Sequence, residues 1–388
     1  MSELIGRANL PRGGGRKVVV AMSGGVDSSV AAVLLAEAGF EVIGVTMRLY
    51  DAANPREARL SRSCCSIEDV DDARATCRRI GARHHFMNFE REFKTHVIDY
   101  FVGEYERGRT PYPCLACNDR LKFEFLLERA ELFGARFVAT GHYARIVDDR
   151  GVFRLTRAID AGKDQSYVLY NLSQRQLART FMPAGHYTKS EVREIARAAG
   201  LGVADKPDSQ DICFIPDGDY RSFVEAKLTR TSPGDVVDLD GKVLRRHDGV
   251  HAFTIGQRRG LGLPGGDGAP LFVTSINPST ATVTVGPASA LLKTTLYASA
   301  VNWVVARPEA PIEVTARIRY RGRDDAARVV PLAGGAARIE FESPQRAVTP
   351  GQAVVFYRCD EVLGGGIIEL EAPSASRASE PAEVLAGD

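Results

Sequence analysis

The sequence lacks any apolar run of about eighteen residues, the length that a membrane-spanning helix needs, so we expect no membrane protein. It also lacks an excess of charge of either sign, because 50 Lys and Arg residues stand against 49 Asp and Glu residues, for a net charge of +1. A polyanionic partner would therefore be bound by local basic patches and not by the overall field. The 388 residues, 44% hydrophobic and 26% charged, are typical of a globular protein with two or three domains.

Cysteine is scarce, with seven residues in the whole chain, and the odd number does not suit a disulfide framework. Residues 1–17 carry positive charge but no apolar stretch of the kind found in a secretory signal peptide. We therefore expect a cytoplasmic protein whose thiols are reduced. In that compartment a clustered cysteine pair more often binds a metal or takes part in catalysis than forms a structural disulfide.

Short apolar runs alternate with amphipathic segments from Lys17 to about Asp208, which predicts a doubly wound α/β domain with a parallel sheet. Thr188 and Glu191 form a predicted capping box, and the turn formers at 205–211 predict a loop that ends at Cys213. The predicted strands are 18–22, 41–47, 85–89 and 136–140, and the predicted helices are 30–38, 68–80, 121–133 and 190–199.

The second half of the chain has a different pattern. One short helix at 220–228 and a hairpin at 235–245 predict a small mixed central domain, and regularly spaced strands at 277–370 predict an antiparallel β-barrel. Residues 312–321 alternate apolar with basic or polar side chains, which predicts a strand with one core face and one basic face. The expected parts are a flexible N-terminus at 1–16, domains at 17–213, 214–276 and 277–370, and a disordered tail at 371–388.

The segment SGGVDSS at 23–29 joins a predicted buried strand to a predicted helix. Two glycines allow close approach of the backbone, and the N–H groups at a helix N-terminus bind anions, so this segment predicts a phosphate site. An ordinary glycine-rich turn with Ser and Asp caps is the alternative. The segment has no lysine of the G-x-x-x-x-G-K-[ST] kind, which favours chemistry at the α-phosphate with pyrophosphate leaving. Gly141 to Tyr143 follow another predicted strand and should face the same crevice.

This segment resembles the signature of the PP-loop ATP pyrophosphatases. Further segments, in order over residues 17–366, resemble the bacterial tRNA-specific 2-thiouridylase family: TPYPCLACN at 110–118, ATGHYA at 139–144, KDQSY at 163–167, DSQDICFI at 208–215, GQRRG at 256–260 and TPGQ at 349–352. The resemblance implies a PP-loop domain of the adenine-nucleotide hydrolase type, then a central domain and a barrel. It implies transfer of AMP from ATP to the C2 oxygen of the wobble uridine, U34, and replacement of that oxygen by sulfur.

The resemblance also implies residue roles. Cys117 would be the catalytic nucleophile and Cys213 would carry a persulfide, while Mg²⁺ would accompany ATP. The implied partners are tRNAs that accept Lys, Glu or Gln, and a persulfide donor such as a cysteine desulfurase or a sulfur-relay protein. Asp27 is a candidate Mg²⁺ ligand or a plain helix cap. The implied nucleotide site consists of Ala21, Met22, Ser23, Gly24, Gly25, Val26, Asp27, Ser28, Met47 and Gly141. The implied tRNA contacts are Tyr112, Pro113, Cys114, His142, Lys163, Asp164, Gln165, Arg319, Tyr320 and Gln352.

One position departs from the family pattern. Many members carry Asp three residues before the nucleophile, where this chain has Cys114, so any acid or base role there is in doubt. Cys114, Cys117 and Cys213 together provide an alternative route, in which three thiolates hold a [4Fe–4S] cluster. Cys64, Cys65, Cys77 and Cys359 match no motif, and we expect incidental thiols there.

Two other functions remain open from the residues alone. An amidating PP-loop synthetase would need a source of ammonia, and the chain has no glutaminase-like domain. A non-catalytic RNA-binding or sulfur-carrier protein would bind tRNA without consuming ATP, which the intact SGGVDSS segment does not favour.

Overall fold

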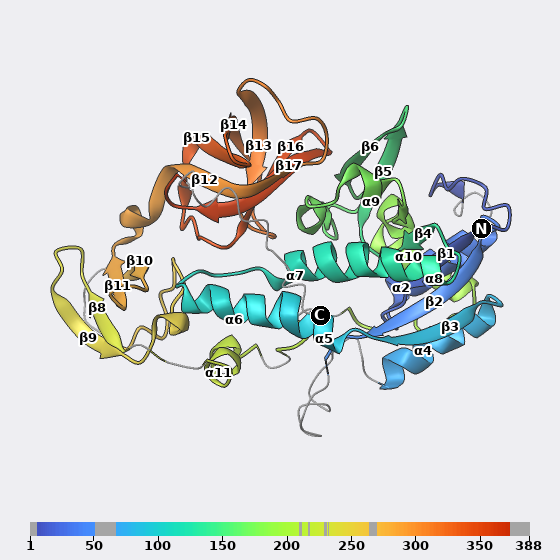
Figure 1. The fold of residues 1–388 in the computed structure, drawn as a ribbon, viewed down its shortest axis with the longest axis horizontal. Coiled ribbons are helices and arrows are strands. Elements are labelled where there is room, and N and C mark those ends of the chain that lie inside the picture. Colours follow the sequence, from blue (N-terminus) through green and yellow to red (C-terminus); the bar gives the residue numbers. More distant parts are fainter. Residues whose placement is uncertain are drawn as a thin grey trace, which may run out of the picture. The chain divides into compact units, whose positions relative to one another are not determined.

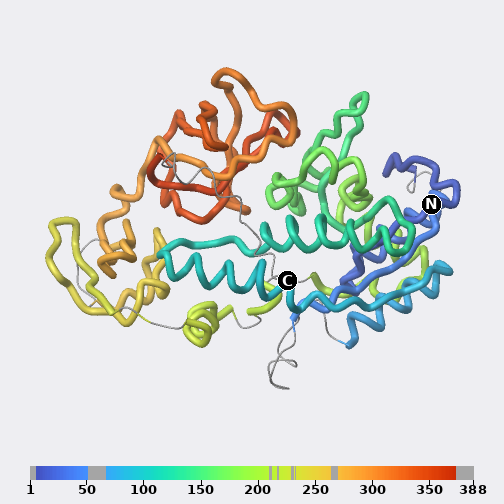
Figure 2. The backbone as a smooth tube through the Cα atoms, in the orientation of Figure 1, coloured from blue at the N-terminus to red at the C-terminus, as the bar shows by residue number. Residues whose placement is uncertain are grey.

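The computed structural model describes residues 6–50, 67–208, 212–215, 218–228, 231, 233–263 and 270–372. The chain divides into two compact units, each assembled from separate stretches of sequence (Figure 1). Figure 2 traces the backbone through these stretches. Unit 1 comprises Met1–Tyr100, Pro113–Tyr220 and Asp360–Val362, and unit 2 comprises Phe101–Tyr112, Arg221–Cys359 and Leu363–Asp388.

Unit 1 contains a parallel sheet of five strands in the order β3-β2-β1-β4-β7. The chain proceeds from β1 to β2 and β3 on one side and continues on the other side with β4 and β7, so the strand order reverses at β1. Parallel sheets of this kind bind ligands at the carboxyl ends of their strands, beside such a reversal. The strands are β1 (Lys17–Ala21), β2 (Glu41–Arg48), β3 (Arg83–Asn88), β4 (Phe137–Ala139) and β7 (Thr180–Phe181).

Two helices, α2 (Val26–Glu37) and α4 (Ile67–Arg79), cover one face of this sheet. Val18 and Val20 of β1 share a hydrophobic cluster with residues of both helices, as expected when alternate side chains of a strand point to one face. The opposite side of α2 packs against α10 (Lys189–Ala198), where Val192 and Ile195 are buried. Helix α2 is therefore buried on two sides, and its N-terminus follows directly from the carboxyl end of β1.

Among the residues that the structure describes, two helical stretches contain π-helical segments. One has the order α5 (Glu90–Phe93), η1 (Lys94–Ile98) and α6 (Asp99–Glu106), and the other has the order α7 (Pro113–Ala116), η2 (Cys117–Phe125) and α8 (Leu126–Leu132). Cys117 is the first residue of the longer π-helical segment, and such segments occur often at functional sites.

The rest of unit 1 consists of shorter elements and the N-terminal segment. Thr188 caps α10 and forms the predicted capping box with Glu191. Residues 6–16, expected as a flexible N-terminus, pack on this unit, because Ala8 is buried and its N–H donates to Tyr187 Oη at 3.0 Å. The remaining elements are β5 (Ala144–Asp149), β6 (Val152–Arg157), η3 (Ser166–Leu169), α9 (Gln174–Leu177) and η4 (Pro183–His186).

Unit 2 contains a four-stranded sheet in the order β10-β11-β8-β9, in which the pair β11 and β8 is parallel and the other two pairs are antiparallel. The predicted hairpin at 235–245 corresponds to β8 and β9. The elements are α11 (Tyr220–Glu225), β8 (Gly234–Val237), β9 (Val243–His247), η5 (Val250–Ala252), β10 (Phe272–Asn277), β11 (Thr282–Gly286) and η6 (Ala288–Leu291).

The predicted barrel is confirmed as six antiparallel strands in the order β12-β15-β14-β13-β16-β17, closed by pairing of β12 with β17. Its core includes Val314, Val329, Ile339 and Phe356. Closure removes the exposed strand edges that an open sheet would present. The strands are β12 (Leu292–Trp303), β13 (Ile312–Arg317), β14 (Asp325–Leu332), β15 (Ala336–Arg346), β16 (Ala353–Arg358) and β17 (Glu361–Glu369).

The strand predicted at 312–321 is too long. It ends at Arg317, because the chain turns where Gly322 N–H donates to the Arg319 carbonyl oxygen at 2.9 Å. The helix predicted at 30–38 is too short, since α2 begins at Val26, and the one predicted at 121–133 belongs to a helical stretch that begins at Pro113. The tail beyond 372, Cys64, Cys65 and Ser209–Asp211 lie outside the described residues.

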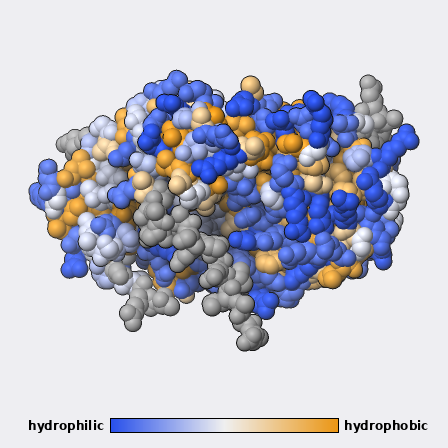
Figure 3. Space-filling view, turned by 45° about the horizontal axis from the view of Figure 1, so that its top comes forward, coloured by the Kyte–Doolittle hydropathy of each residue, from blue (hydrophilic) through white to orange (hydrophobic). Residues whose placement is uncertain are grey.

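The surface carries hydrophobic side chains on several separate elements, including Ile67 of α4, Phe86 of β3, Leu132 of α8 and Val243 of β9. The face shown in Figure 3 is mainly hydrophilic, with smaller hydrophobic areas between. None of the helices in the described ranges has the length and apolar character needed to cross a membrane.

Candidate functional site

The loop between β1 and α2 has the geometry of an anion cradle. Gly24 has a φ of 71°, and a Cβ there would lie 2.3 Å from the Asp69 carbonyl oxygen, so only glycine fits. Gly25 is the N-cap of α2 and has no side chain to cover the first-turn N–H groups. Ser28 Oγ donates to the Gly25 carbonyl oxygen at 3.2 Å and accepts from Ser23 N–H at 3.2 Å. The helix N-terminus is thus held open for a negatively charged group.

Gly141, at the carboxyl end of β4, lies directly against this helix N-terminus. A Cβ at Gly141 would lie 2.5 Å from Ser28 N and 2.6 Å from the carbonyl carbon of Asp27. The neighbouring His142 is buried, and its Nδ1 lies 2.7 Å from Thr140 Oγ1. Burial, with Lys122 nearby, holds the pKa of His142 well below its usual range, so the imidazole is neutral at neutral pH. The predicted meeting of the two strand ends is confirmed.

Asp27, in the first turn of α2, is the centre of a set of polar contacts. Lys189 Nζ donates to its two carboxylate oxygens at 2.6 and 2.8 Å, and Tyr143 Oη donates to Oδ1 at 2.7 Å. Burial beside Asp27 raises the pKa of Tyr143, which therefore stays a phenol. Both carboxylate oxygens of Asp27 therefore contact a lysine in this structure, and its role as a Mg²⁺ ligand stays a prediction.

Asp208 is the second carboxylate of this set. Its Oδ1 lies 2.8 Å from Lys189 Nζ and 3.3 Å from Arg193 Nη2, and its Oδ2 accepts from Lys163 Nζ at 2.7 Å. Although partial burial opposes the shift, the hydrogen bonds from Lys163 and Lys189 lower the pKa of Asp208. These two carboxylates, Lys163, Lys189 and Arg193 thus form one network of charged side chains that begins in the first turn of α2.

The same segment of chain contacts the phosphate loop a second time. Lys206 Nζ donates to the Gly24 carbonyl oxygen at 3.1 Å, to Asp69 Oδ1 at 2.6 Å and to Asp72 Oδ2 at 2.6 Å. Residues 206–208 therefore bridge the loop on two sides, and Cys213 follows five residues later.

The predicted tRNA contacts Lys163, Asp164 and Gln165 lie beside the loop in unit 1. Gln165 accepts from Tyr143 N–H through Oε1 at 2.9 Å and donates its own N–H to the Tyr143 carbonyl oxygen at 2.8 Å. Asp164 is buried and accepts from Ala158 N–H at 3.1 Å and Ser166 Oγ at 2.9 Å. Its observed bonds hold the loop, whereas Lys163 is partly exposed.

The three motif thiols also lie in unit 1. Cys114 is half-buried in α7, Cys117 is buried at the start of η2, and Cys213 is half-buried in a turn. Pro113 begins a continuous helical stretch, α7 followed by η2, in which Cys114 belongs to α7 and Cys117 to η2. Phe214, next to Cys213, packs edge to face on Phe93 of α5 with ring centroids 5.6 Å apart, and α5 itself contacts η2. The segments that carry Cys117 and Cys213 therefore pack against one short helix.

The cysteines do not fit a metal cluster. Within the described ranges, which include Cys114, Cys117 and Cys213, no group of three His, Cys, Asp or Glu side chains converges as metal ligands do. The alternative [4Fe–4S] route is therefore not supported by this donor arrangement. Asn118, the residue after Cys117, connects η2 to η3, because its Nδ2 donates to the Val168 carbonyl oxygen at 3.1 Å.

The other predicted residues of unit 1 take ordinary positions. Met47 is buried near the carboxyl end of β2, where the family pattern places adenine. Cys77 is buried against Gly44, and burial raises the pKa of its thiol to about 11. Cys359 is exposed.

Unit 2 brings several of the predicted tRNA contacts together. The rings of Tyr112 and Tyr320 are stacked with centroids 5.9 Å apart and planes inclined by 27°. Gln352 Nε2 donates to the Thr110 carbonyl oxygen at 2.8 Å, and Thr110 N–H donates to the Pro350 carbonyl oxygen at 2.9 Å. Sequence positions more than 200 residues apart thus meet around one extended segment.

Arg319 lies in the turn after β13 and not on a strand. Its Nη2 donates to the carbonyl oxygens of Arg346 and Ala347. Arg109, which precedes Thr110 in the chain, is itself fixed by ion pairs with Glu104 at 2.6 Å and with Glu369 at 2.5 Å. Aromatic rings and cations therefore occur together here, a combination that suits single-stranded RNA.

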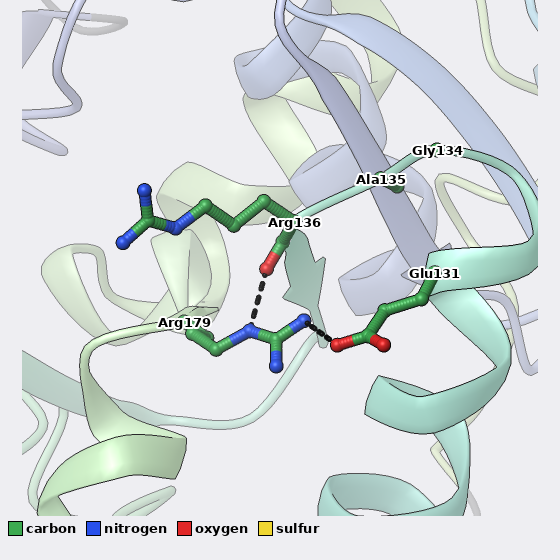
Figure 4. Close-up of a pocket in the computed structure, with 5 residues that line it drawn as sticks. All are labelled: Glu131, Gly134, Ala135, Arg136 and Arg179. Carbon is green, nitrogen blue, oxygen red and sulfur yellow. Dashed lines mark hydrogen bonds and ion pairs between the residues drawn. The ribbon is translucent and has the colours of Figure 1, made fainter.

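A separate hollow lies at the opposite, amino ends of the strands (Figure 4). Arg179 extends across it and donates to the Arg136 carbonyl oxygen at 2.9 Å and to Glu131 Oε1 at 2.9 Å. Gly134 and Ala135 complete its lining. Since ligands of parallel sheets bind at the carboxyl ends, this hollow is not the candidate site.

The comparisons with known proteins agree with this geometry. A family model described as a tRNA methyl transferase HUP domain matches residues 16–217. The tRNA-specific 2-thiouridylases of Pelotomaculum thermopropionicum and Clostridium perfringens are each 50% identical over 356 residues, 91% of this chain and 97% and 98% of theirs. That of Carboxydothermus hydrogenoformans is 50% identical over 92% of this chain and 98% of its own. The chain belongs to the tRNA-specific 2-thiouridylase family.

Two further family models divide the remainder of this thiouridylase-family chain. One, described as a tRNA methyl transferase PRC-barrel domain, matches residues 221–287, and the other, an aminomethyltransferase β-barrel domain, matches residues 293–368. The models carry methyltransferase names, whereas the relatives that match most of the chain are named as thiouridylases. An anion cradle and motif thiols in the same unit agree with the thiouridylase name.

Sequence reasoning did not find Lys189, Tyr143 or Arg193. The sequence holds one indication for Lys189. A lysine in the first turn of a helix interacts unfavourably with the helix dipole, so its presence there indicates a role other than helix stability. Tyr143 lies within the ATGHYA segment at 139–144, and nothing in the sequence pairs it with Asp27.

Proposed function

We propose that this member of the family replaces the C2 oxygen of the wobble uridine of tRNA by sulfur, consuming ATP and releasing AMP and pyrophosphate. The observation that carries the proposal is the presence, in one unit, of an open α2 N-terminus at the end of β1 and of Cys117 and Cys213 on segments that both pack against α5. The family membership supplies the reaction class.

The first step would use the phosphate cradle. The uridine C2 oxygen attacks the α-phosphorus of ATP, the bond between the α- and β-phosphates breaks, and pyrophosphate leaves. N–H groups at the start of α2 stabilise the negative charge that develops on the phosphates. Gly141 permits the close approach of β4 to this helix end, and the neutral His142 adds no charge there.

The second step would use the two thiols. A persulfide on Cys213 attacks C2 through its terminal sulfur, and AMP leaves with the former C2 oxygen. The Cys117 thiolate then attacks the Cys213 sulfur, so that the sulfur–sulfur bond breaks and the thiocarbonyl is released with the electron pair. The product enzyme contains a Cys117–Cys213 disulfide, which a thiol reductant must reduce before a persulfide donor, such as a cysteine desulfurase or a relay protein, reloads Cys213.

Recognition of the anticodon loop is assigned to the cluster in unit 2 and to the loop 163–165. Tyr112 and Tyr320 offer stacking surfaces for unpaired bases, while Arg319 and Lys163 offer charge for phosphates. The tRNAs would be those that accept Lys, Glu or Gln.

The test is thiolation of unmodified tRNA with ATP, a cysteine desulfurase and cysteine, with 2-thiouridine measured by mass spectrometry of the nucleosides. We expect 2-thiouridine, AMP and pyrophosphate in equal amounts, and no thionucleoside from Cys213→Ser or Cys117→Ser, although both variants bind ATP and tRNA. Cys359→Ser is the matched control, because that thiol is exposed and outside every motif. Full formation of 2-thiouridine by Cys213→Ser would contradict the proposal that Cys213 carries the persulfide. If the parent protein binds tRNA but consumes no ATP, the proposed enzymatic activity is wrong.

A further inference from the structure

The amino ends of the parallel strands carry a row of cationic side chains, at the opposite end of the sheet from the phosphate loop. Lys17 is the first residue of β1, Arg136 directly precedes β4 and Arg179 directly precedes β7. These three strands are neighbours in the sheet. Lys17 and Arg136 lie side by side, because the residues that follow them, Val18 and Phe137, are paired. Like charges on neighbouring strands destabilise a sheet, which indicates a role other than stability.

Lys17 and Arg136 have no carboxylate partner within the described ranges. Lys17 Nζ donates to the Phe133 carbonyl oxygen at 3.2 Å, which is an uncharged acceptor. The Arg136 guanidinium lies 6.0 Å from the centroid of the Phe137 ring and extends away from Glu131 (Figure 4). Arg136 is exposed and Lys17 is only half-buried, so an anion can reach both charges.

Arg16 directly precedes β1 and is held in place by uncharged groups. Its Nε donates to the Gly13 carbonyl oxygen at 3.0 Å, and its Nη2 donates to the Arg12 carbonyl oxygen at 2.7 Å. The guanidinium also lies over the rings of Phe40 and Phe137, 5.3 and 5.4 Å from their centroids. A guanidinium has five N–H donors, and these bonds leave several of them for phosphate oxygens. Because Arg16 is already ordered, binding a phosphate costs it little side-chain entropy.

The glycines at 13–15 keep the surface beside this arginine open. Gly13 N–H donates to the carbonyl oxygen of Ala38, the C-cap of α2, at 2.7 Å, so the segment is fixed to unit 1. Cβ atoms at Gly14 and Gly15 would meet nothing within 4 Å. An RNA backbone can therefore approach the segment closely, between the arginines at its two ends. Segments rich in arginine and glycine are also used by other proteins to bind nucleic acids.

Two carboxylates near these amino ends are already paired. Glu131 forms an ion pair with Arg179 at 2.9 Å, and Glu41, at the start of β2, forms one with Arg83 at 3.0 Å. The three cations described above are left without a paired carboxylate, in a chain whose net charge is +1. A local surface of this kind is what a nearly neutral protein needs to attract a polyanion.

We propose that Arg16, Lys17, Arg136 and Arg179 form an amino-end cation surface, which binds backbone phosphates of the tRNA away from the wobble uridine. The inference rests on the proposed function, which brings this polyanion to unit 1. β1 has five residues and spans about 17 Å. A tRNA whose wobble uridine lies at the carboxyl ends of the strands therefore meets this surface with another part of its backbone. Such phosphate contacts position a nucleic acid and supply affinity without reading its sequence.

The experiment measures the affinity of the full-length protein for unmodified tRNA by fluorescence anisotropy at several salt concentrations. Lys17→Gln/Arg136→Gln should weaken binding about tenfold, because one exposed charge pair contributes up to about fivefold. The slope of log Kd against log salt concentration should fall by about two, one for each lost phosphate contact. In the thiolation assay, KM for tRNA should rise in proportion, while kcat and KM for ATP stay the same.

Glu131→Gln should have the opposite effect on tRNA binding. The Glu131 side chain is 59% exposed, and glutamine keeps an oxygen that can accept from Arg179. Removal of the negative charge leaves Arg179 free to attract phosphates, so binding of tRNA should strengthen by several-fold. If the pair of Glu131 and Arg179 only stabilises the fold, the melting temperature should fall and the affinity should not rise, which would contradict the assignment of Arg179.

Arg150→Gln is the matched control, because Arg150 is 97% exposed and lies in the turn between β5 and β6 of unit 1. Its affinity and its salt slope should equal those of the parent. Parent-like affinity and slope in Lys17→Gln/Arg136→Gln would overturn the inference. If that variant binds tRNA normally but accepts sulfur from the cysteine desulfurase more slowly, the surface binds an acidic protein and the inference is wrong.

The binding and thiolation assays separate this inference from the proposed function. If the parent makes 2-thiouridine and the double variant binds tRNA as the parent does, the cation surface is wrong and the proposed function stands. If the double variant binds tRNA more weakly, with the smaller salt slope, but the parent makes no 2-thiouridine, the proposed function fails and the phosphate contacts stand.

Discussion

Gly141→Ala tests whether the end of β4 fixes the N-terminus of α2. The new Cβ would lie 2.5 Å from Ser28 N and 2.6 Å from the Asp27 carbonyl carbon, where ordinary contact begins near 3.4 Å. Both neighbours are backbone atoms of a buried helix, so the strand end and the helix must separate by about 0.9 Å. Overpacking of this kind costs about 1 to 3 kcal/mol.

Peptide-level hydrogen exchange is the suitable assay, because it resolves unit 1 from unit 2 in a chain that is too large for a two-state analysis. A loss of about 1 to 3 kcal/mol corresponds to roughly 5- to 150-fold faster exchange in α2 and β4, with unchanged exchange in the barrel strands. Affinity for an ATP analogue should fall as well, since the displaced N–H groups belong to the phosphate cradle.

The control for this substitution is Gly202→Ala in the same unit. Gly202 has an ordinary φ, and a Cβ there would meet nothing within 4 Å. We expect a change within about 0.5 kcal/mol. Parent-like exchange and affinity in Gly141→Ala would refute the close approach of β4 to α2 as the feature that shapes the cradle.

Two other substitutions and measurements address single side chains. Arg319→Ala should weaken tRNA binding and lower the slope of log Kd against log salt concentration by about one, if the guanidinium contacts a phosphate. A lower melting temperature with an unchanged slope would mean that Arg319 only binds the carbonyl oxygens of residues 346 and 347. Cys77, whose thiol pKa is raised to about 11, should have about a thousandth of its molecules as thiolate at pH 8. Its alkylation in the native protein should be at least about tenfold slower than that of the exposed Cys359 and equal to it in urea; similar native rates would contradict the assigned burial.

Local patterns were sufficient to predict the elements whose cause is local. The strand and glycine turn before α2, the capping box of Thr188 and Glu191, and the alternation in the barrel strands follow from side chains within a few residues of one another. The same reasoning failed for Arg319, because a turn closed by Gly322 ended a strand whose alternation continued in the sequence.

The contacts of the candidate site depend on residues far apart in the chain. Lys189 and Asp27 are separated by 162 positions, and Tyr143 and Asp27 by 116, so no spacing rule connects them. The motif resemblance identified Cys117 and Cys213 but could not foresee that η2 is π-helical or that Phe214 packs on Phe93, since both result from tertiary packing. Residues with ordinary local roles, such as Lys189, became notable only when their neighbours were known.

The division of each unit among separate stretches has a consequence for synthesis on the ribosome. Residues 101–112 leave the ribosome early. The contacts of Thr110 with Pro350 and Gln352, and of Tyr112 with Tyr320, can form only after the later residues have been translated. Asp360–Val362 completes unit 1 only after nearly all of unit 2 has been made. Both units are therefore complete only when β17 has been translated, and the pairing of β12 with β17 that closes the barrel comes at the end of synthesis.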